Sequence, residues 1–214
     1  MRRILYLGTD PENFLQKTKD VQLTHYPIIS IAPRPMSHPD VQRAYAQLHR
    51  YTHILFTSKN AVRIFFNYLP TFAKPVWIAI GRATAASLAS HLGKDPDYIA
   101  SQETQEGIAH LLEQIPLADD AYFLLPRSSL SRSLLTKYLD KRKVAYFVCD
   151  LYDTHVQRKG PLPHLRDFDE IVFTSPSTVR AFIKIFGALP TDKILTPIGP
   201  ITMHCLQIQR TSLR

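Results

Sequence analysis

The sequence predicts an α/β protein of two lobes that share one repeated strand–turn–helix unit. The first observation is a repeat: residues 54–65 (ILFTSKNAVRIF) and 171–182 (IVFTSPSTVRAF) are identical at seven of twelve positions. The second is a shorter match between 80–84 (IGRAT) and 198–202 (IGPIT), at an offset of 118 residues against 117 for the first. The third is a regular alternation of short apolar runs with helical patterns, which favours βαβ units and parallel sheets.

Each copy opens with a buried strand followed by a helix. The runs 53–58 and 170–175 are apolar, β-branched and aromatic, as is typical of a strand inside a parallel sheet. Ser58 and Ser175 end these runs and are natural N-caps, and Pro176 suits a first helical position. Apolar residues then recur at helical spacing: Val62, Phe65, Phe66 and Leu69 in the first copy, and Val179, Phe182, Ile183 and Phe186 in the second.

Each copy continues with a second strand, which breaks at Gly81 or Gly199 and enters another helix. These strands are expected at 76–80 and 194–198, and the helices at 83–93 and 200–209. Between the copies we expect strands at 97–101, 121–126 and 144–156 and helices at 104–115 and 133–143. The first residues indicate a strand at 4–8, an indistinct segment at 11–20 and one long strand-like run at 21–33.

Composition limits the class of protein. The 214 residues suffice for one large or two small domains, and the longest apolar runs are too short to span a bilayer. Cys149 and Cys205 lie in apolar sequence without a CxxC, as expected of buried thiols in a reducing compartment, so we expect a cytoplasmic protein. The nine histidines are scattered without a zinc motif, so no metal site is expected.

The charge balance favours an anionic partner. Lys and Arg number 26 against 18 Asp and Glu, which gives a net charge of +8. The basic residues are dispersed, and the densest cluster, 141–143, has only three. No stretch interleaves closely spaced Lys and Arg with aromatic residues, so we expect no nucleic-acid partner.

Small polar residues gather where the predicted strands end. Ligands of open α/β sheets bind beyond these ends, where helix N-termini present free N–H groups that favour anions. The candidates are Thr57, Ser58, Gly81, Arg82, Thr84, Arg127, Ser128, Ser175, Ser177, Gly199 and Thr202. The same residues also serve as ordinary N-caps and turns. Nucleotide fingerprints, a GxSxG elbow and a catalytic triad are absent, so the residues alone indicate a two-lobed anion binder without an evident catalytic group.

Taken together, these motifs resemble the uroporphyrinogen-III synthase family. The resemblance rests on the twin FTSxxxV units, the two IGxxT turns, LLPRSS at 124–129 and LYDT at 151–154, and it covers almost the whole chain in a consistent order. It implies two flavodoxin-like lobes joined by two connecting strands, 21–34 and 144–156. One lobe would comprise residues 1–34 and 156–214 and the other 35–155, with the substrate in the cleft between them.

The resemblance also implies a reaction. The family cyclises hydroxymethylbilane, a linear tetrapyrrole with an acetate and a propionate on every ring. Loss of its terminal hydroxyl as water gives an azafulvene cation, and closure through a spiro intermediate inverts the last ring. No cofactor is needed, because such a site acts by positioning and electrostatics. A polyanionic substrate fits the charge of +8.

Residue by residue, the resemblance assigns roles at this site. Tyr152 of LYDT matches the tyrosine that assists departure of the hydroxyl, and a phenol can donate a proton or a hydrogen bond at neutral pH. Thr84 and Thr202 of the IGxxT turns are expected to bind carboxylates. Arg127 is the expected charge partner, although the serines that follow it depart from the glycine common there. The remaining candidates match positions that face the cleft.

One departure concerns the C-terminal end. The family continues for a further strand and helix after the IGPxT helix, as the first repeat does here, whereas this sequence stops at Arg214. We therefore expect either a naturally short protein or a truncated chain, with one lobe lacking an element.

Two other readings remain open. One is a non-catalytic two-lobed protein that binds a small polyanionic ligand, which would not need Tyr152. The other is a nucleic-acid-associated protein, motivated by charge alone, whose binding would depend steeply on salt. Nothing in the sequence suggests a dimer interface or a membrane partner, so we expect a monomer.

Overall fold

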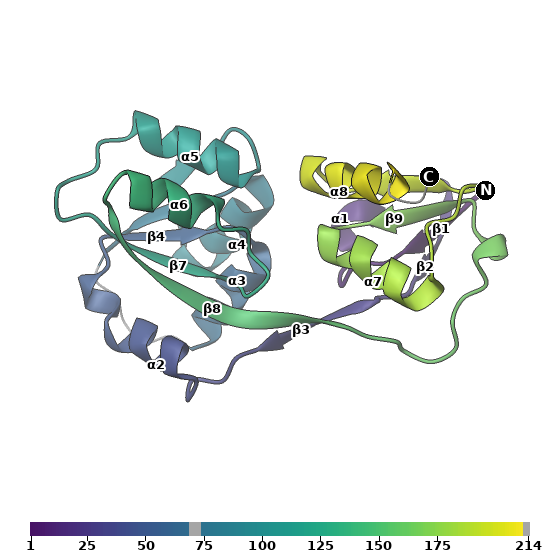
Figure 1. Ribbon diagram of the computed structural model, residues 1–214, viewed down its shortest axis with the longest axis horizontal. Helices are drawn as coiled ribbons and strands as arrows, with labels where there is room; N and C mark the ends of the chain where they lie inside the picture. The colour runs from purple at the N-terminus through teal and green to yellow at the C-terminus, as the bar shows by residue number, and fades with distance from the viewer. Residues whose placement is uncertain (69–73, 212–214) are drawn as a thin grey trace. The chain divides into compact units, whose positions relative to one another are not determined.

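The computed structural model describes residues 1–68 and 74–211 (Figure 1). The chain divides into two compact units: unit 1 consists of Met1–Ile31 and Thr154–Arg214, and unit 2 of Ala32–Asp153. The chain leaves unit 1 through strand β3 (Ile29–Pro33) and returns through β8 (Ala145–Val156). The expected class, an α/β protein with parallel sheets flanked by helices, is confirmed. Leu69, expected in the first repeated helix, lies outside the described residues.

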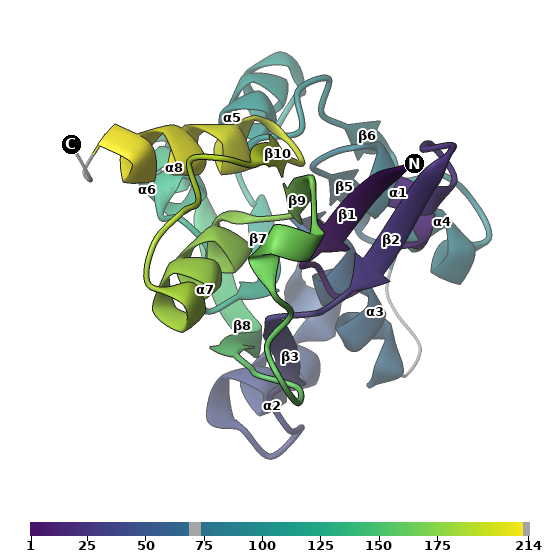
Figure 2. The same cartoon turned by 90° about the vertical axis from the view of Figure 1, so that its right-hand side faces the viewer.

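Unit 1 is built on a parallel sheet of order β10-β9-β1-β2. Its strands are β1 (Arg2–Tyr6), β2 (Val21–His25), β9 (Glu170–Phe173) and β10 (Ile194–Pro197). Its helices are α1 (Glu12–Leu15), the 3-10 turn η2 (Leu165–Asp167), α7 (Pro176–Phe186) and α8 (Pro200–Thr211). Strands β1 and β2 run side by side (Figure 2).

The main core of unit 1 lies between this sheet and helices α7 and α8. Strand residues such as Leu5 and Phe173 pack there against Phe182 of α7 and Leu206 of α8, and all four are buried. The opposite face of the sheet carries a smaller cluster of Ile4, Tyr6 and Val172, against which Phe14 of the short helix α1 packs. Alternation of side chains along each strand separates the two clusters.

Unit 2 contains a sheet of order β3-β8-β7-β4-β5-β6. Besides β3 and β8, its strands are β4 (His53–Phe56), β5 (Val76–Ala79), β6 (Tyr98–Ile99) and β7 (Tyr122–Ser128). Its helices are α2 (Pro39–Ala46), the 3-10 turn η1 (Leu48–Arg50), α3 (Lys59–Asn67), α4 (Arg82–Leu92), α5 (Gln105–Gln114) and α6 (Leu134–Lys141). Helix α2 was not predicted; only Val41 and Ala44 of its eight residues are buried, so its apolar pattern is weak.

Helices cover both faces of the unit 2 sheet. On one face, Leu55 and Phe123 of the strands share a core with Ile108 of α5 and Leu135 of α6. On the other face, Phe56 packs edge-on against Phe65 of α3, with ring centroids 5.3 Å apart. The repeat appears as two equivalent runs of elements: β4-α3-β5-α4 in unit 2 matches β9-α7-β10-α8 in unit 1.

The helix caps expected at the repeated serines are confirmed. Ser58 Oγ accepts a hydrogen bond from the Ala61 N–H at 3.1 Å and caps α3. Ser175 caps α7 in a capping box with Thr178, and Pro176 occupies the first turn. These caps begin each helix directly after its strand.

The long run at 21–33 is not one connecting strand. It forms β2, which pairs with β1, and then β3, which lies beside β8 in the other sheet. Pro27 separates them because it has no N–H for a ladder and restricts the residue before it. The Tyr26 and Ile28 N–H groups on either side of it bond to the carbonyls of Tyr6 and Leu7.

Strand β7 is longer than expected. Arg127 and Ser128 were placed beyond the strand end and next to a helix N-terminus, but they continue the ladder with β8, and α6 starts only at Leu134. The polar side chains of both residues therefore lie on a strand. None of the helices among the described residues is long and apolar enough to cross a membrane.

Gly107 in α5 packs closely against the loop before that helix. A Cβ on Gly107 would fall well inside van der Waals contact of the Gln102 carbonyl oxygen, which belongs to the backbone and cannot turn away. Helix propensity favours Ala over Gly by about 0.8–1 kcal/mol, but overpacking costs about 1–3 kcal/mol. We expect Gly107→Ala to lower the free energy of unfolding by about 1 kcal/mol in urea titration. Gln114→Ala, at the exposed end of the same helix, is the control, and a stabilised Gly107→Ala protein would contradict the packing.

Candidate functional site

The centre of the candidate site is an irregularity in the pairing of β7 with β8. Arg127 pairs with Asp150, but the next residue, Ser128, pairs with Tyr152, so Leu151 is an extra residue on β8. Such a bulge bends a strand and redirects its side chains. Leu151 and Tyr152 are both buried, with 0% and 5% of their surfaces exposed.

The Tyr152 phenol contacts a serine hydroxyl. Its oxygen lies 3.0 Å from Ser58 Oγ, and Ser128 is the residue that pairs with Tyr152 across the β7–β8 ladder. Burial raises the pKa of the Tyr152 phenol above its usual value, while the hydrogen bonds with the two serines act in the opposite direction. The phenol is therefore protonated at neutral pH.

Backbone groups hold both serines in place. Ser58 Oγ accepts the Ala61 N–H as the N-cap of α3, and Ser128 Oγ accepts the Leu130 N–H at 3.2 Å. The main chain of β8 is tied to the same turn, because the Ser129 N–H donates to the Tyr152 carbonyl at 3.1 Å. Three elements, β4-α3, β7 and β8, thus converge on one phenol.

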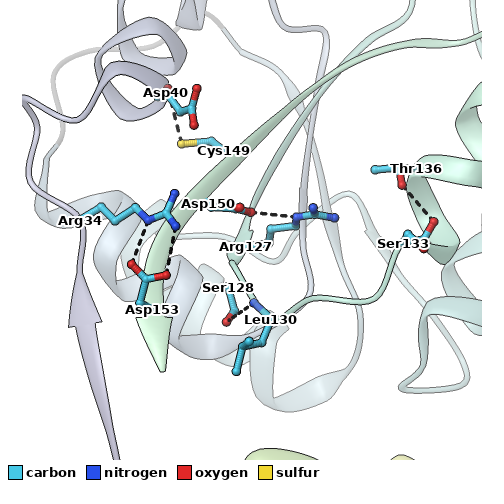
Figure 3. A network of polar contacts seen from close by, with 10 residues as sticks. All are labelled: Arg34, Asp40, Arg127, Ser128, Leu130, Ser133, Thr136, Cys149, Asp150 and Asp153. Carbon is cyan, nitrogen blue, oxygen red and sulfur yellow. Dashed lines mark hydrogen bonds and ion pairs between the residues drawn. The ribbon is translucent and has the colours of Figure 1, made fainter. Parts of the chain in front are cut away.

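Two ion pairs flank Tyr152 along β8 (Figure 3). Arg127 Nε on β7 donates to Asp150 Oδ1 at 3.0 Å. On the other side, Arg34, just after β3, makes a two-pronged contact with Asp153, at 3.0 Å for each nitrogen–oxygen pair. These side chains are between a fifth and a third exposed, so the pairs are partly shielded from water. They fix β8 to its two neighbours on either side of the bulge.

Arg127 was expected to pair with a substrate carboxylate, and in the structure it pairs with Asp150 through Nε. Neither Asp150 nor Asp153 was singled out from the sequence, nor was Arg34. The available signal was an unusual one: two aspartates lie within an otherwise apolar and aromatic strand run, a place where charges need partners on adjacent strands.

The turn that begins α4 is filled by a carboxylate of the chain itself. The Arg82 N–H donates to Glu103 Oε1 at 2.9 Å. Gly81 is buried at this point, and a Cβ there would lie 2.7 Å from the same oxygen, so the absence of a side chain lets Glu103 approach. Sequence reasoning predicted an anion at this helix N-terminus but missed Glu103, which comes from the loop after β6.

The two threonines of the IGxxT turns occupy equivalent places. Thr84 in α4 and Thr202 in α8 are each the third residue of their helix, and only 5% and 3% of their surfaces are exposed. Both hydroxyls therefore lie beneath their turns. The glycines differ: nothing lies within 4 Å of a Cβ built on Gly199, which has a φ of 84°.

The other unit 1 candidates lie where β9 ends. Ser175 accepts the Thr178 N–H as a cap, and Ser177 is half-buried in the first turn of α7. Thr174, next to them, closes on Gly8 at the end of β1, where a Cβ would approach its hydroxyl oxygen to 2.8 Å. In unit 2, Thr57 is half-buried directly before the Ser58 cap. The structure thus brings Ser58 into contact with Tyr152 and pairs Ser128 with Tyr152 across the ladder, and it places the other candidates at the ends of their own strands.

Within residues 1–68 and 74–211, no group of three or more His, Cys, Asp or Glu side chains is arranged to hold a metal ion. Cys149 is buried beside the Asp40 carbonyl, and burial raises the pKa of its thiol to about 12. This thiol is therefore not a nucleophile at neutral pH.

The chain aligns with solved structures from two bacteria. A uroporphyrinogen III synthase mutant of Thermus thermophilus aligns with a TM-score of 0.67 and 17% identity, covering 98% of this chain and 90% of that one. The uroporphyrinogen-III synthetase of Helicobacter pylori aligns with a TM-score of 0.62 and 19% identity over the same shares. At this identity the likeness establishes the fold.

Sequence comparison goes further. Two archaeal relatives carry the provisional name uroporphyrinogen-III synthase. The protein of Methanothermobacter thermautotrophicus is 27% identical over 172 residues, which are 72% of this chain and 68% of that one. The protein of Methanocaldococcus jannaschii is 25% identical over 189 residues, 81% of this chain and 78% of that one. The family model described as uroporphyrinogen-III synthase HemD matches residues 15–209. The chain belongs to the uroporphyrinogen-III synthase family.

Family membership confirms the prediction made from the repeated FTSxxxV, IGxxT and LYDT motifs. Within a uroporphyrinogen-III synthase fold, the bulge at Leu151 and the serine contacts give Tyr152 of LYDT a defined environment. The roles of the individual residues remain predictions.

Proposed function

We propose that this chain catalyses the uroporphyrinogen-III synthase reaction, the lyase step that closes hydroxymethylbilane with loss of water and inversion of its last pyrrole ring. The observation that carries the proposal is the buried Tyr152 phenol, 3.0 Å from the Ser58 hydroxyl, in a chain that matches the family model from residue 15 to residue 209. The raised pKa of the phenol keeps its proton available at neutral pH.

In the proposed mechanism Tyr152 donates this proton to the terminal hydroxyl of the substrate. The carbon–oxygen bond breaks, water leaves, and the electron pair of the pyrrole nitrogen stabilises the cation as an azafulvene. The last ring attacks through its substituted carbon to give the spiro intermediate, which reopens and recloses with that ring inverted. A final proton loss from the ring restores the pyrrole, and an equivalent proton restores the phenol.

The other candidates are proposed to hold the carboxylates of the substrate. Thr57 in unit 2 and Ser175, Ser177 and Gly199 in unit 1 lie at strand ends or helix starts, where N–H groups and hydroxyls donate hydrogen bonds to anions. Arg127 lies on β7 and pairs with Asp150 through Nε, so its other guanidinium N–H groups are the ones proposed to bind a carboxylate. The net charge of +8 assists the approach of a polyanion. Thr84 and Thr202 are only 5% and 3% exposed, so we propose that they support the turns whose N–H groups bind the carboxylates. Uroporphyrinogen-III synthesis needs no cofactor in this scheme, and a cytoplasmic monomer remains our expectation.

A turnover assay separates this proposal from the alternative of a non-catalytic polyanion binder. Hydroxymethylbilane is supplied in large excess over the protein, and porphyrinogen formation is followed against the spontaneous reaction. We expect many molecules of product per molecule of protein at a rate above the control. A binder would sequester substrate and slow closure, and that result would overturn the proposal.

Glu103 provides a separate test of the α4 turn as a carboxylate site. If Gly81 and Arg82 receive a substrate carboxylate, Glu103 competes for the same N–H. A carboxylate at a helix N-terminus is worth about 0.3–1 kcal/mol, so Glu103→Ala is expected to lower KM by about two- to fivefold with kcat unchanged.

The matched control is Glu106→Ala, which removes an equal charge nearby but breaks an ion pair with Arg132 on the surface instead. An equal decrease of KM in both variants would indicate general charge repulsion and would exclude the α4 turn as a substrate site.

A further inference from the structure

The Arg127 side chain gives the protein only one of its guanidinium nitrogens. Its Nε donates to Asp150 Oδ1 at 3.0 Å, between residues that are paired across the β7–β8 ladder. The two terminal nitrogens make no hydrogen bond or ion pair with the described residues. Neither is a buried atom without a partner, so both reach solvent. In Figure 3 the guanidinium extends beyond the Asp150 contact. The terminal nitrogens therefore form an open pair of donors.

Arg34, on the other side of β8, is held differently. Its Nε and one terminal nitrogen both donate to Asp153, at 3.0 Å each. The two arginine side chains are equally shielded, with 20% of Arg34 and 19% of Arg127 exposed. Two-pronged contact with a carboxylate is the strong pairing that an arginine prefers. Asp153 uses this pairing, whereas Asp150 holds only Nε and leaves both terminal nitrogens of its arginine open.

The open end of Arg127 lies beside the candidate catalytic residue. Arg127 is followed on β7 by Ser128, which pairs with Tyr152. Both residues are at the carboxyl end of their strand, where ligands of open α/β sheets bind. A linear tetrapyrrole carries carboxylates on every ring, so a substrate that reacts at Tyr152 also has carboxylates to offer next to it.

We propose that Asp150 is a positioning residue: it holds Arg127 at Nε so that both terminal nitrogens face one carboxylate of the substrate. This deepens the proposed function and rests on it. The outer edge of a guanidinium matches a carboxylate in a two-pronged contact. Fixing one such flexible side chain before the ligand arrives improves binding about two- to tenfold, because its rotamer freedom is not lost on binding.

Charge alone predicts the opposite effect of Asp150. A carboxylate beside an anion site repels the anion, so its removal should strengthen the binding of a polyanion. Release of the Arg127 guanidinium should instead weaken that binding. An ion pair that serves only to join β7 to β8 would change stability and leave affinity as it was. The direction of the affinity change therefore distinguishes these three roles.

The experiment compares Asp150→Ala with Asp150→Asn. The ligand is the oxidised type III porphyrin, which carries the acetate and propionate groups of the substrate and does not react, and its fluorescence gives Kd. The Asp150 side chain is 25% exposed, so its truncation leaves no sealed cavity. We expect Asp150→Ala to raise Kd about two- to tenfold. Asp150→Asn keeps an oxygen that accepts the Nε–H and should bind at least as tightly as wild type.

Asp153→Ala is the matched control. It removes an equal charge from the same strand and also breaks an ion pair with a neighbouring strand. Its Kd should not rise, because Arg34 has no open pair of terminal nitrogens to lose. The KM for hydroxymethylbilane in the coupled assay should change in the same direction as Kd in each variant.

Arg127→Lys tests whether Asp150 acts through Arg127. Lysine keeps the charge but lacks the planar fork, so we expect Kd to rise by about tenfold. In this background Asp150→Ala should no longer weaken binding, since no guanidinium remains to be oriented. The four proteins form a double-mutant cycle that isolates this coupling.

Unchanged or tighter binding by Asp150→Ala overturns the proposal. It is also overturned if Asp150→Asn binds as weakly as Asp150→Ala, if Asp153→Ala shows an equal loss, or if the loss persists in Arg127→Lys. The titration needs no turnover. A wild-type chain that binds the porphyrin without converting hydroxymethylbilane would refute the proposed function and leave the role of Asp150 standing. A wild-type chain that does not bind the porphyrin would overturn that role.

Discussion

Replacing Tyr152 by Phe is expected to lower kcat by about 10²–10⁴-fold, the usual contribution of a general acid, with KM nearly unchanged. The buried phenol contacts the Ser58 hydroxyl, and phenylalanine keeps the ring while removing the proton. Initial rates of product formation at varied hydroxymethylbilane concentration measure both constants.

Tyr146→Phe is the matched control for this substitution. Tyr146 lies on the same strand, and its hydroxyl donates to Asp140 at 2.9 Å on the exposed side of the protein. This variant should keep the wild-type kcat. A Tyr152→Phe protein with kcat close to that of wild type would remove Tyr152 from the chemistry and favour a site that acts by positioning alone.

Truncation of Phe173 is expected to have the largest effect on stability, a loss of about 3–5 kcal/mol in the free energy of unfolding for Phe173→Ala. Its side chain is completely buried at the end of β9, and its ring packs edge-on against Phe182 of α7 at 5.4 Å. Urea titration followed by circular dichroism measures this loss. Phe173→Leu, which keeps most of the volume, should lose clearly less than Phe173→Ala.

The equivalent position of the repeat gives a second comparison. Phe56 is completely buried in unit 2, where it packs on Phe65 and Trp77, the single tryptophan of the chain. Phe56→Ala should therefore shift the unfolding transition that Trp77 fluorescence reports.

A loss of less than about 1 kcal/mol for Phe173→Ala, well below the range for buried aromatic side chains, would contradict the core assigned to unit 1.

The sequence was informative wherever local chemistry decides the structure. The repeated strands at 53–58 and 170–175 end at Ser58 and Ser175, and both serines cap the helices that follow. Apolar β-branched runs, N-cap hydroxyls and a proline in the first turn act within a few residues, so a single sequence shows them. For the same reason Pro27 could have revealed that the run at 21–33 is two strands.

Features that depend on contacts between distant segments were not predictable in this way. The bulge at Leu151 arises from the register of β7 against β8, which no local pattern specifies. Likewise, the pairing of Arg34 with Asp153 joins residues 119 apart in the chain. Arg127 was identified as important, but its partner Asp150 became visible only in the structure.

The same distinction applies to the α4 turn. The sequence predicted that its N-terminal amides attract an anion, and the structure shows that Glu103, 21 residues further along, supplies one. A glycine at a helix start indicates close approach of some group, but it does not say whether that group belongs to a ligand or to the protein.

The isomer of the porphyrinogen formed from fresh hydroxymethylbilane tests the central claim most directly. The product is oxidised, and the type I and type III porphyrins are separated by chromatography, beside a reaction without protein, in which spontaneous closure gives type I. The account predicts type III as the main product with the wild-type chain and a return toward type I with Tyr152→Phe. Type I alone, from wild-type protein shown to be folded by circular dichroism, would contradict the assignment of this chain as a synthase.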